Sequence, residues 1–331
     1  MAVTIALGGD TMLGRGVGDR INATGPYGLL SAEVREIFTE ADLSLLNLEC
    51  CVSNRGRPWQ APGKPFHFRA PPEAMGVLTE LGVDCVTLAN NHALDFGHEA
   101  LGDTLRHLAG AGIKTVGAGR NRDEARAPAV LEANGMTVAV IGVTDHPEDF
   151  QATEDTPGVA YARLSEGVPE WLTTMIEELA EKYDVVVVTP HWGPNMTTEP
   201  PKYIRRAAKT LLTAGATLIA GHSAHVFHGV EGPIVYDLGD LIDDYARDER
   251  LRNDLGLAVV AKIENRTVSM TANPIHLHYC HTTTAEAGNR AWIKNRLKTA
   301  CTEFTTDVED ENRALTLRTQ HRYPQRRTTK P

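Results

Sequence analysis

The sequence lacks a long apolar run and contains few cysteines. No stretch of its 331 residues reaches the roughly 18 to 20 apolar residues that a membrane-spanning helix requires. The N-terminus enters the strand-like run Val3–Leu7 directly, without the charged and apolar regions of a signal peptide. The five cysteines have no CxxC spacing, which argues against a disulfide framework or a structural zinc site. We therefore expect a cytoplasmic protein with no membrane anchor and with buried free thiols.

The chain also lacks an excess of basic residues. Its formal net charge is −10 at pH 7, whereas nucleic-acid binding requires a clustered basic surface. We therefore expect no nucleic-acid partner, and we expect the locally basic segment Arg318–Lys330 to be a solvated or disordered tail. What the chain does contain, 42% hydrophobic and 23% charged residues, is typical of a globular protein with a large core.

Short apolar runs alternate with helical patterns, which predicts β-α-β units and a largely parallel or mixed sheet. The expected strands are Ala2–Gly8, Leu43–Leu48, Val83–Ala89, Lys114–Val116, Ala129–Ala133, Thr137–Val143, Asp184–Thr189 and Thr217–Ala220, followed by Ile234–Asp237, Leu255–Ile263 and Thr267–Ala272 as antiparallel strands that close the sheet. The expected helices are Ser31–Thr39, Pro72–Leu81, His98–Ala111, Pro169–Lys182 and Pro201–Ala214.

Two segments stand outside this alternation. Cys51–Pro72 is rich in Gly, Pro and Arg and is expected to be a long irregular loop. From Thr282 onward the sequence is polar and at most helical. We therefore divide the chain into a main domain, residues 1–280, and a polar C-terminal extension, residues 281–331, which is partly helical and ends in the basic tail.

Five strand ends carry side chains of metal-binding types: Asp10, Glu49, Asn91-His92, His191, and the His222/His225 pair. The carboxyl ends of strands in an open α/β sheet meet at one edge, so these groups are expected to converge. Carboxylates, an amide oxygen and imidazoles are ligands that divalent cations select. Each junction alone also fits an ordinary turn or helix cap. Together they favour a site for one or two divalent ions, with Mn, Zn, Ca and Mg all compatible.

Several segments resemble the CapA (poly-γ-glutamate capsule biosynthesis) family. They are Gly9-Asp10-Thr11-Met12-Leu13, Asn47-Leu48-Glu49, Phe68-Arg69-Ala70-Pro71-Pro72-Glu73, Ala89-Asn90-Asn91-His92 with Asp95 and Gly97, His191-Trp192-Gly193, Gly221-His222-Ser223-Ala224-His225-Val226 and Tyr236-Asp237-Leu238-Gly239-Asp240. That family is similar to the calcineurin-like metallophosphatases. The resemblance therefore implies an α/β fold for residues 1–280, a four-layer αββα sandwich of mixed sheets flanked by helices.

The resemblance also implies roles for individual residues. Glu49 would bridge two metal ions; Asn91, His191 and His222 would hold one of them, and Asp10 and His225 the other. His92 would be the acid/base group, with Asp95 orienting its ring. Met12 is a departure from the metallophosphatase pattern, in which a histidine follows the first aspartate by two positions, so the first metal site has lost a nitrogen ligand.

Capsule-type members of the family act beside a membrane and carry an N-terminal anchor, which this chain lacks. The chain resembles instead a soluble CapA-like branch that epimerises a residue Cα in lasso peptides. We therefore expect a metal-dependent peptide epimerase, an isomerase in ribosomal-peptide biosynthesis, with His92 on one face of the Cα. Candidates for the second proton group are His191, Asp10, Cys51 and Lys64.

Other interpretations remain open. Lys64, His67 and Arg69, in the loop Gln60–Arg69, would grip a terminal carboxylate of a peptide substrate or form a solvated basic loop. The first alternative function is a metallohydrolase of γ-glutamyl (poly-γ-glutamate-type) or phosphoester bonds. The second is a capsule-assembly subunit with a vestigial metal site, against which the retained ligand types count.

Overall fold

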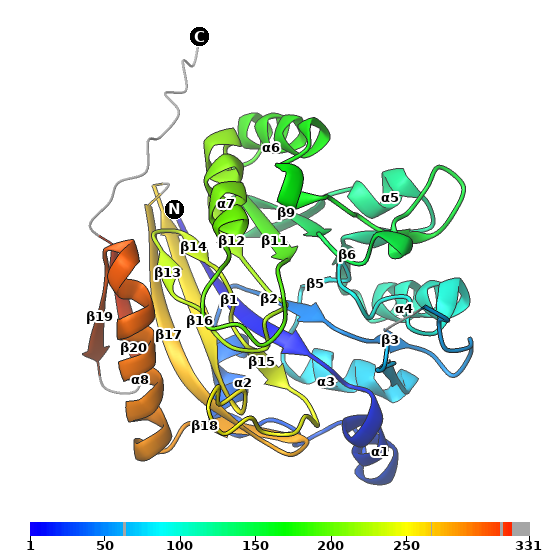
Figure 1. Cartoon of the computed structure of the whole chain (residues 1–331), viewed down its shortest axis with the longest axis horizontal. Coiled ribbons are helices and arrows are strands. Elements are labelled where there is room, and N and C mark those ends of the chain that lie inside the picture. Colours follow the sequence, from blue (N-terminus) through cyan, green and yellow to red (C-terminus); the bar gives the residue numbers. More distant parts are fainter. Residues whose placement is uncertain (62–63, 266, 312–313, 320–331) are drawn as a thin grey trace.

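A computed structural model of the chain describes residues 1–61, 64–265, 267–311 and 314–319 (Figure 1). The expected basic tail therefore lies outside the described residues from residue 320 onward. None of the helices in the described part has the length and apolar character needed to cross a bilayer. All five cysteines are free and buried, as expected.

The first sheet has ten strands in the order β19-β20-β17-β16-β1-β2-β5-β6, with β15 beside β1 and β18 beside β17. Its parallel strands are β1 (Ala2–Thr11), β2 (Leu43–Leu48), β5 (Cys85–Thr87), β6 (Lys114–Val116) and β15 (Asp240–Ile242). The antiparallel part consists of β16 (Leu255–Glu264), β17 (Thr267–His278), β18 (His281–Thr284), β19 (Thr306–Glu311) and β20 (Ala314–Thr319).

The second sheet has six strands in the order β13-β14-β12-β11-β9-β8. They are β8 (Ala129–Ala133), β9 (Met136–Thr144), β11 (Val185–His191), β12 (Leu218–Ala220), β13 (Val230–Glu231) and β14 (Ile234–Val235). Short pairs join β3 (Cys51–Val52) to β4 (Arg69–Ala70) and β7 (Ala118–Gly119) to β10 (Gly158–Val159).

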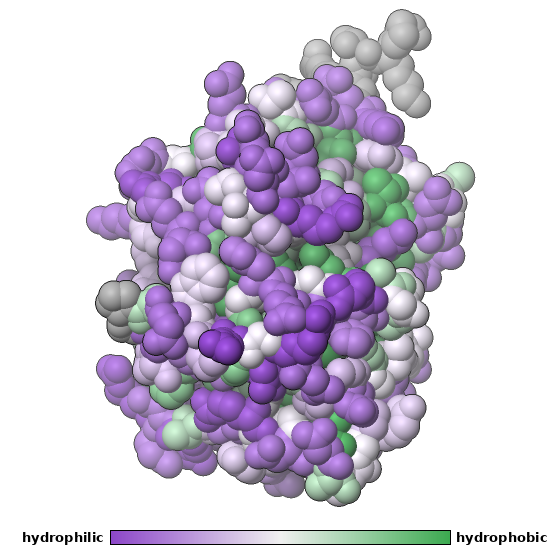
Figure 2. All heavy atoms as spheres, turned by 90° about the vertical axis from the view of Figure 1, so that its right-hand side faces the viewer, coloured by the Kyte–Doolittle hydropathy of each residue, from purple (hydrophilic) through white to green (hydrophobic). Residues whose placement is uncertain are grey.

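Helices cover the outer face of each sheet (Figure 1). The first sheet is covered by α1 (Arg15–Thr24), α2 (Ala32–Thr39), α3 (Met75–Glu80) and α4 (Gly97–Gly110), and the second by α5 (Arg122–Arg126), α6 (Glu170–Lys182) and α7 (Lys202–Ala214). The remaining helix is α8 (Ala287–Cys301), and single 3₁₀ turns occupy η1 (Pro72–Ala74), η2 (Glu148–Phe150), η3 (Leu164–Glu166) and η4 (Thr302–Phe304). Figure 2 shows the α1 and α4 side of the molecule as a mostly hydrophilic face with apolar atoms between the polar ones.

The layering follows from the period-two alternation of strand side chains. Ile5 and Leu7 of β1 pack between the sheets against Val185 and Val187 of β11, whereas the intervening Val186 faces the outer helices. Burial of each such side chain contributes about 1.5–3 kcal/mol. The predicted four-layer αββα sandwich is therefore confirmed.

Two sequence expectations were wrong. The segment after Thr282 forms strands as well as a helix: β18, β19 and β20 extend the first sheet, and α8 buries Ile293 and Leu297 between the sheets. The boundary expected at residue 280 thus falls inside the β17–β18 hairpin. The strand expected at Ile234–Asp237 is β14, which runs parallel to β12 in the second sheet and is antiparallel only to its edge neighbour β13.

Candidate metal centre

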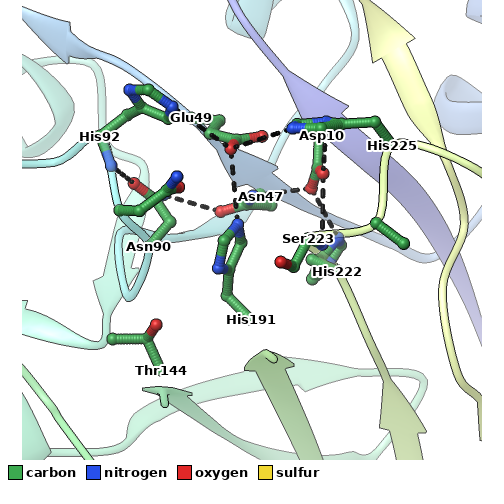
Figure 3. Close-up of polar contacts among 12 residues, drawn as sticks. Asp10, Asn47, Glu49, Asn90, His92, Thr144, His191, His222, Ser223 and His225 are labelled. Carbon is green, nitrogen blue, oxygen red and sulfur yellow. Dashed lines mark hydrogen bonds and ion pairs between the residues drawn. The ribbon is translucent and has the colours of Figure 1, made fainter. Parts of the chain in front are cut away.

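The carboxyl ends of parallel strands from both sheets meet at one edge of the sandwich (Figure 3). Asp10 lies near the end of β1, Glu49 follows β2, His92 follows β5, His191 ends β11 and His222 follows β12. A β-bridge between His191 and His222 joins two of these ends directly. The fold thus delivers acidic groups from the first sheet and imidazoles mainly from the second.

Glu49 lies at the centre of the cluster. Its Oε1 is 3.4 Å from Nε2 of His191 and 3.9 Å from Nε2 of both His92 and His225. The side chain is fully buried, and neither oxygen has a hydrogen-bond partner among the described residues. Burial, reinforced by the neighbouring Asp10, raises the pKa of Glu49. A carboxyl group buried in this way is stabilised either by a proton or by a bound cation.

Asp10 contacts two imidazoles at once. Its Oδ1 lies 3.3 Å from Nδ1 of His222, and its Oδ2 lies 3.3 Å from Nδ1 of His225. Burial alone would raise the pKa of Asp10, but the two neighbouring imidazoles lower it well below its usual range. The preceding Gly9 is required by close approach of the backbone, since a Cβ there would lie 1.8 Å from the Gly239 carbonyl oxygen.

Asp240 is a cluster residue to which the sequence analysis assigned no role. It begins β15, pairs with Asp10 across the strands, and its Oδ1 lies 2.8 Å from Nδ1 of His225. Asp10, Glu49, His225 and Asp240 offer ligand atoms that all lie within 4.8 Å of one another. The signal in the sequence was the Tyr236–Asp240 segment directly after a short apolar strand. Asp237 in that segment accepts the Ala224 and Gly239 N–H groups and so shapes the His222–His225 loop.

The donor atoms of this cluster fit divalent metal ions. Buried atoms without a hydrogen-bond partner among the described residues include both oxygens of Glu49, Oδ1 of Asn91, both ring nitrogens of His191, Nδ1 of His222 and Oδ2 of Asp240. Such atoms are costly unless a ligand uses them, and their types are those that bind divalent cations. Burial also lowers the pKa of His191, which favours the neutral imidazole that a metal requires.

Met12 is not part of this cluster. It lies in the apolar core between the first sheet and its helices, and its Sδ accepts the Gly14 N–H at 3.1 Å. The position that holds histidine in metallophosphatases therefore supplies no ligand in this structure.

His92 is held by a chain of buried contacts. Its Nδ1 lies 2.6 Å from Oδ2 of Asp95, whose other oxygen lies 2.7 Å from Nζ of Lys64. The Phe68 ring stacks on the imidazole at a centroid distance of 4.0 Å. Burial lowers the pKa of His92 to about 4, although Asp95 opposes this shift. Asn90 closes the turn: it donates to Asn47 and the Leu48 carbonyl and accepts the His92 N–H.

The three expected substrate-binding residues are engaged within the protein. Lys64 also donates to the Asn91 carbonyl at 2.7 Å and is 13% exposed. The His67 ring contacts the Trp59 carbonyl at 2.9 Å. Arg69 donates to the Arg55 carbonyl and lies over the Phe96 ring. Of the three, only Lys64 reaches the residues around His92; the substrate contacts themselves stay a prediction.

Two further groups border the cluster. His146, which follows β9, has its ring centroid 5.0 Å from that of His191, and its Nδ1 lies 2.5 Å from Oδ1 of Asp145. Cys51 lies on β3, where its thiol donates to the Phe68 carbonyl, and burial raises its pKa. Burial raises the pKa of the neighbouring Cys50 to about 12, so burial disfavours the thiolate form of both residues.

A family model and similar curated proteins point to the same protein family. Residues 4–245 match the family model described as bacterial capsule synthesis protein PGA_cap. A probable polyglutamine synthesis accessory protein of Mycobacterium tuberculosis is 30% identical over 91% of this chain and 92% of its own length. The PGA biosynthesis protein CapA of Bacillus subtilis is 32% identical over 82% of this chain and 70% of its own.

Among solved structures, a putative 5′-nucleotidase from Staphylococcus aureus overlays with a TM-score of 0.46 at 13% identity, covering 89% of this chain and 58% of that chain. An identity this low does not inform the chemistry of the site. The family match and the two relatives above do establish the family. This chain belongs to the PGA_cap family of bacterial capsule synthesis proteins.

Proposed function

We propose that this protein is a metal-dependent enzyme that acts on a peptide and inverts one residue by exchanging its Cα proton. Its substrate in this proposal is a ribosomally made, lasso-type peptide, and its location is the cytoplasm. The observation that supports the proposal is the orientation of His92. One ring nitrogen is bound to Asp95, and the other faces Glu49 and the cluster.

His92 is suited to act as a base. Because Asp95 accepts the Nδ1–H, the lone pair on Nε2 of the neutral ring is left directed at the cluster. The cluster around Asp10, Glu49 and His225 would hold a divalent ion, which would supply Lewis acidity to the carbonyl beside the reacting Cα. His92 takes the Cα proton, and Asp95 stabilises the imidazolium that forms. Such a positioned base contributes about 10²- to 10⁴-fold to the rate.

Inversion also needs a proton donor on the opposite face of the Cα. Two of the candidates expected from the sequence already have partners: the Cys51 thiol donates to the Phe68 carbonyl, and the Lys64 ammonium group pairs with Asp95. Asp10 and His191 remain at the cluster. His146 joins them as the stronger candidate, because it carries its own carboxylate, Asp145, and comes from the second sheet, whereas His92 comes from the first.

Hydrolysis of γ-glutamyl or phosphoester bonds is the second candidate function. The relatives described as acting in polyglutamine and PGA synthesis bear on the polymer in this second proposal and not on its reaction. In that reaction His92 would take a proton from the attacking water and pass it to the leaving group, instead of removing a carbon-bound proton.

The experiment that separates the two is incubation of the Mn²⁺-loaded protein with candidate peptides in deuterated water. We expect one deuterium at a single Cα, a D-residue after acid hydrolysis, and unchanged connectivity. His92→Ala should give no label, whereas His107→Ala, on the outer helix α4, should label normally. A new amine, carboxylate or free phosphate with every Cα unlabelled would show hydrolysis instead.

A further inference from the structure

A rim of aromatic rings surrounds one guanidinium beside the cluster. The Arg15 guanidinium carbon lies 5.7 Å from the ring centroid of Phe66, 5.3 Å from that of Phe68 and 5.9 Å from that of Tyr245. We call these four residues the Arg15 rim. Phe68 stacks on His92, and the Tyr245 ring meets His225 edge-on at 5.3 Å. The rim therefore contacts both the proposed base and a ligand of the proposed metal site.

The Arg15 guanidinium is held by the Asp244 carboxylate, which uses only part of its hydrogen-bonding capacity. Its Nε and Nη2 each lie 3.1 Å from an oxygen of Asp244, which is almost fully buried. In the described part of the chain, no hydrogen bond or ion pair engages Nη1, and 38% of the side chain is exposed. The backbone of Arg15 has a φ of +48°, which is uncommon outside glycine, and Asp244 also accepts the Gly16 N–H. A charged donor edge is thus held in place.

Tyr245 adds a second unused donor. Its hydroxyl is buried and has no hydrogen-bond partner among the described residues. The phenol O–H is a hydrogen-bond donor, and it lies beside the cluster because the Tyr245 ring meets His225. A buried hydroxyl without a partner is rare in native proteins and points to an absent acceptor.

We propose that Arg15 and Tyr245 bind a carboxylate of the substrate next to the reacting bond. Arg15 makes the charged contact from the rim, and Tyr245 donates its O–H closer to the cluster. The aromatic walls fit apolar atoms on either side of the carboxylate. The reacting bond is identified only by the proposed function, on which this inference rests. The carboxylate belongs either to the end of a peptide chain or to a glutamyl side chain, and the test separates these sources.

The test measures calorimetric binding of three peptides to the Mn²⁺-loaded protein. They are N-acetyl-alanyl-phenylalanine, its C-terminal amide, and N-acetyl-glutamyl-phenylalanine amide, which carries only a side-chain carboxylate. We expect one or both carboxylate peptides to bind about tenfold more tightly than the uncharged amide. The peptide that shows this preference identifies the source of the carboxylate.

Variants test the two donors. Arg15→Gln combined with Asp244→Asn avoids leaving a buried unpaired carboxylate, and it should reduce the preference to about twofold or less. Tyr245→Phe should reduce it by about fivefold. The controls Arg57→Gln and Tyr27→Phe, both exposed, should keep the preference. Equal binding of the three peptides by the wild type, or a full preference in the double variant, would overturn the inference.

Deuterium labelling of the same samples keeps the two proposals separate. Cα labelling without a carboxylate preference contradicts the Arg15 rim proposal alone. A carboxylate preference that depends on Arg15, without labelling of any substrate, contradicts the epimerase proposal alone.

Discussion

His92 and Asp95 form a hydrogen-bonded pair in which Nδ1 and Oδ2 lie 2.6 Å apart. The carboxylate is itself fixed by the Phe68 N–H at 2.6 Å and by Nζ of Lys64 at 2.7 Å. A ring held in this way keeps one tautomer and one orientation. His92 is therefore placed to move a proton beside the proposed metal ligands.

Replacement of His92 by alanine should separate turnover from metal binding. We expect His92→Ala to reduce kcat by about 10²- to 10⁴-fold while the bound metal stays near its wild-type stoichiometry. His222→Ala should lose metal as well, because His222 offers an unpartnered ring nitrogen to the cluster. Elemental analysis beside the kinetic assay checks both variants. Loss of metal in His92→Ala would make His92 a ligand.

Replacement of Lys64 tests whether this residue binds the substrate or positions Asp95. A lysine that grips the substrate affects KM, whereas a lysine that holds Asp95 affects kcat through His92. Because Lys64 lies against Asp95 and is mostly buried, we expect Lys64→Met to lower kcat by about 10- to 100-fold with little change in KM. Steady-state kinetics decide the question, and a rise in KM at constant kcat would restore the substrate-binding role expected from the sequence.

The fold was predictable where strands are apolar and bounded by turns. Leu43–Leu48, Lys114–Val116 and Ala129–Ala133 have the predicted bounds, since each is a short run ended by polar residues or glycine. Helix α1 was not expected, because it starts at a left-handed Arg15 and contains two glycines. In β19, Val308 is buried while its neighbours are charged and exposed. This alternation is typical of a strand with one solvated face, but the segment is so polar that it was not recognised as a strand from the sequence.

The residues of the cluster were only partly predictable from the sequence, because some of them meet only through tertiary contacts. The carboxyl ends of parallel strands lie at one edge of a sheet, and this placed Asp10 and Glu49 at the edge of the first sheet and His191 at the edge of the second. Asp240 and Tyr245 join them through the segment 237–245, whose path depends on tertiary contacts such as the Asp10 N–H to Gly239 carbonyl bond. No local pattern encodes that proximity.

The docking of α8 gives a prediction for stability. Leu297 is fully buried between the sheets, so Leu297→Ala should lower the free energy of unfolding by about 2–5 kcal/mol. The exposed neighbour Lys298→Ala should change it by less than about 0.5 kcal/mol. Urea unfolding followed by tryptophan fluorescence checks both. An unchanged midpoint for Leu297→Ala would mean that residues beyond 280 form an independent extension.

His228 gives a prediction for pH dependence. Burial lowers its pKa to about 4, and its ring contacts the Thr197 carbonyl at 3.0 Å. Between about pH 6.5 and 4 the unfolded chain binds a proton that the folded chain excludes, so stability falls as the pH decreases, by up to about 1.4 kcal/mol per pH unit. His228→Gln removes this contribution. Urea unfolding of chelator-treated protein at pH 7 and 5 should show a smaller pH loss in the variant than in the wild type. Equal losses would mean that the pKa of His228 is not lowered in the folded protein.

The metal content of the purified protein shows directly whether the cluster around Glu49 binds metal. Among the described residues, neither buried oxygen of Glu49 has a hydrogen-bond partner, and three imidazole nitrogens lie within 3.9 Å of Oε1. We expect elemental analysis to find one or two divalent ions per chain in the wild type and a loss of at least one of them in Glu49→Ala. A wild-type protein that stays metal-free after incubation with Mn²⁺ or Zn²⁺, yet turns over substrate, would contradict the account.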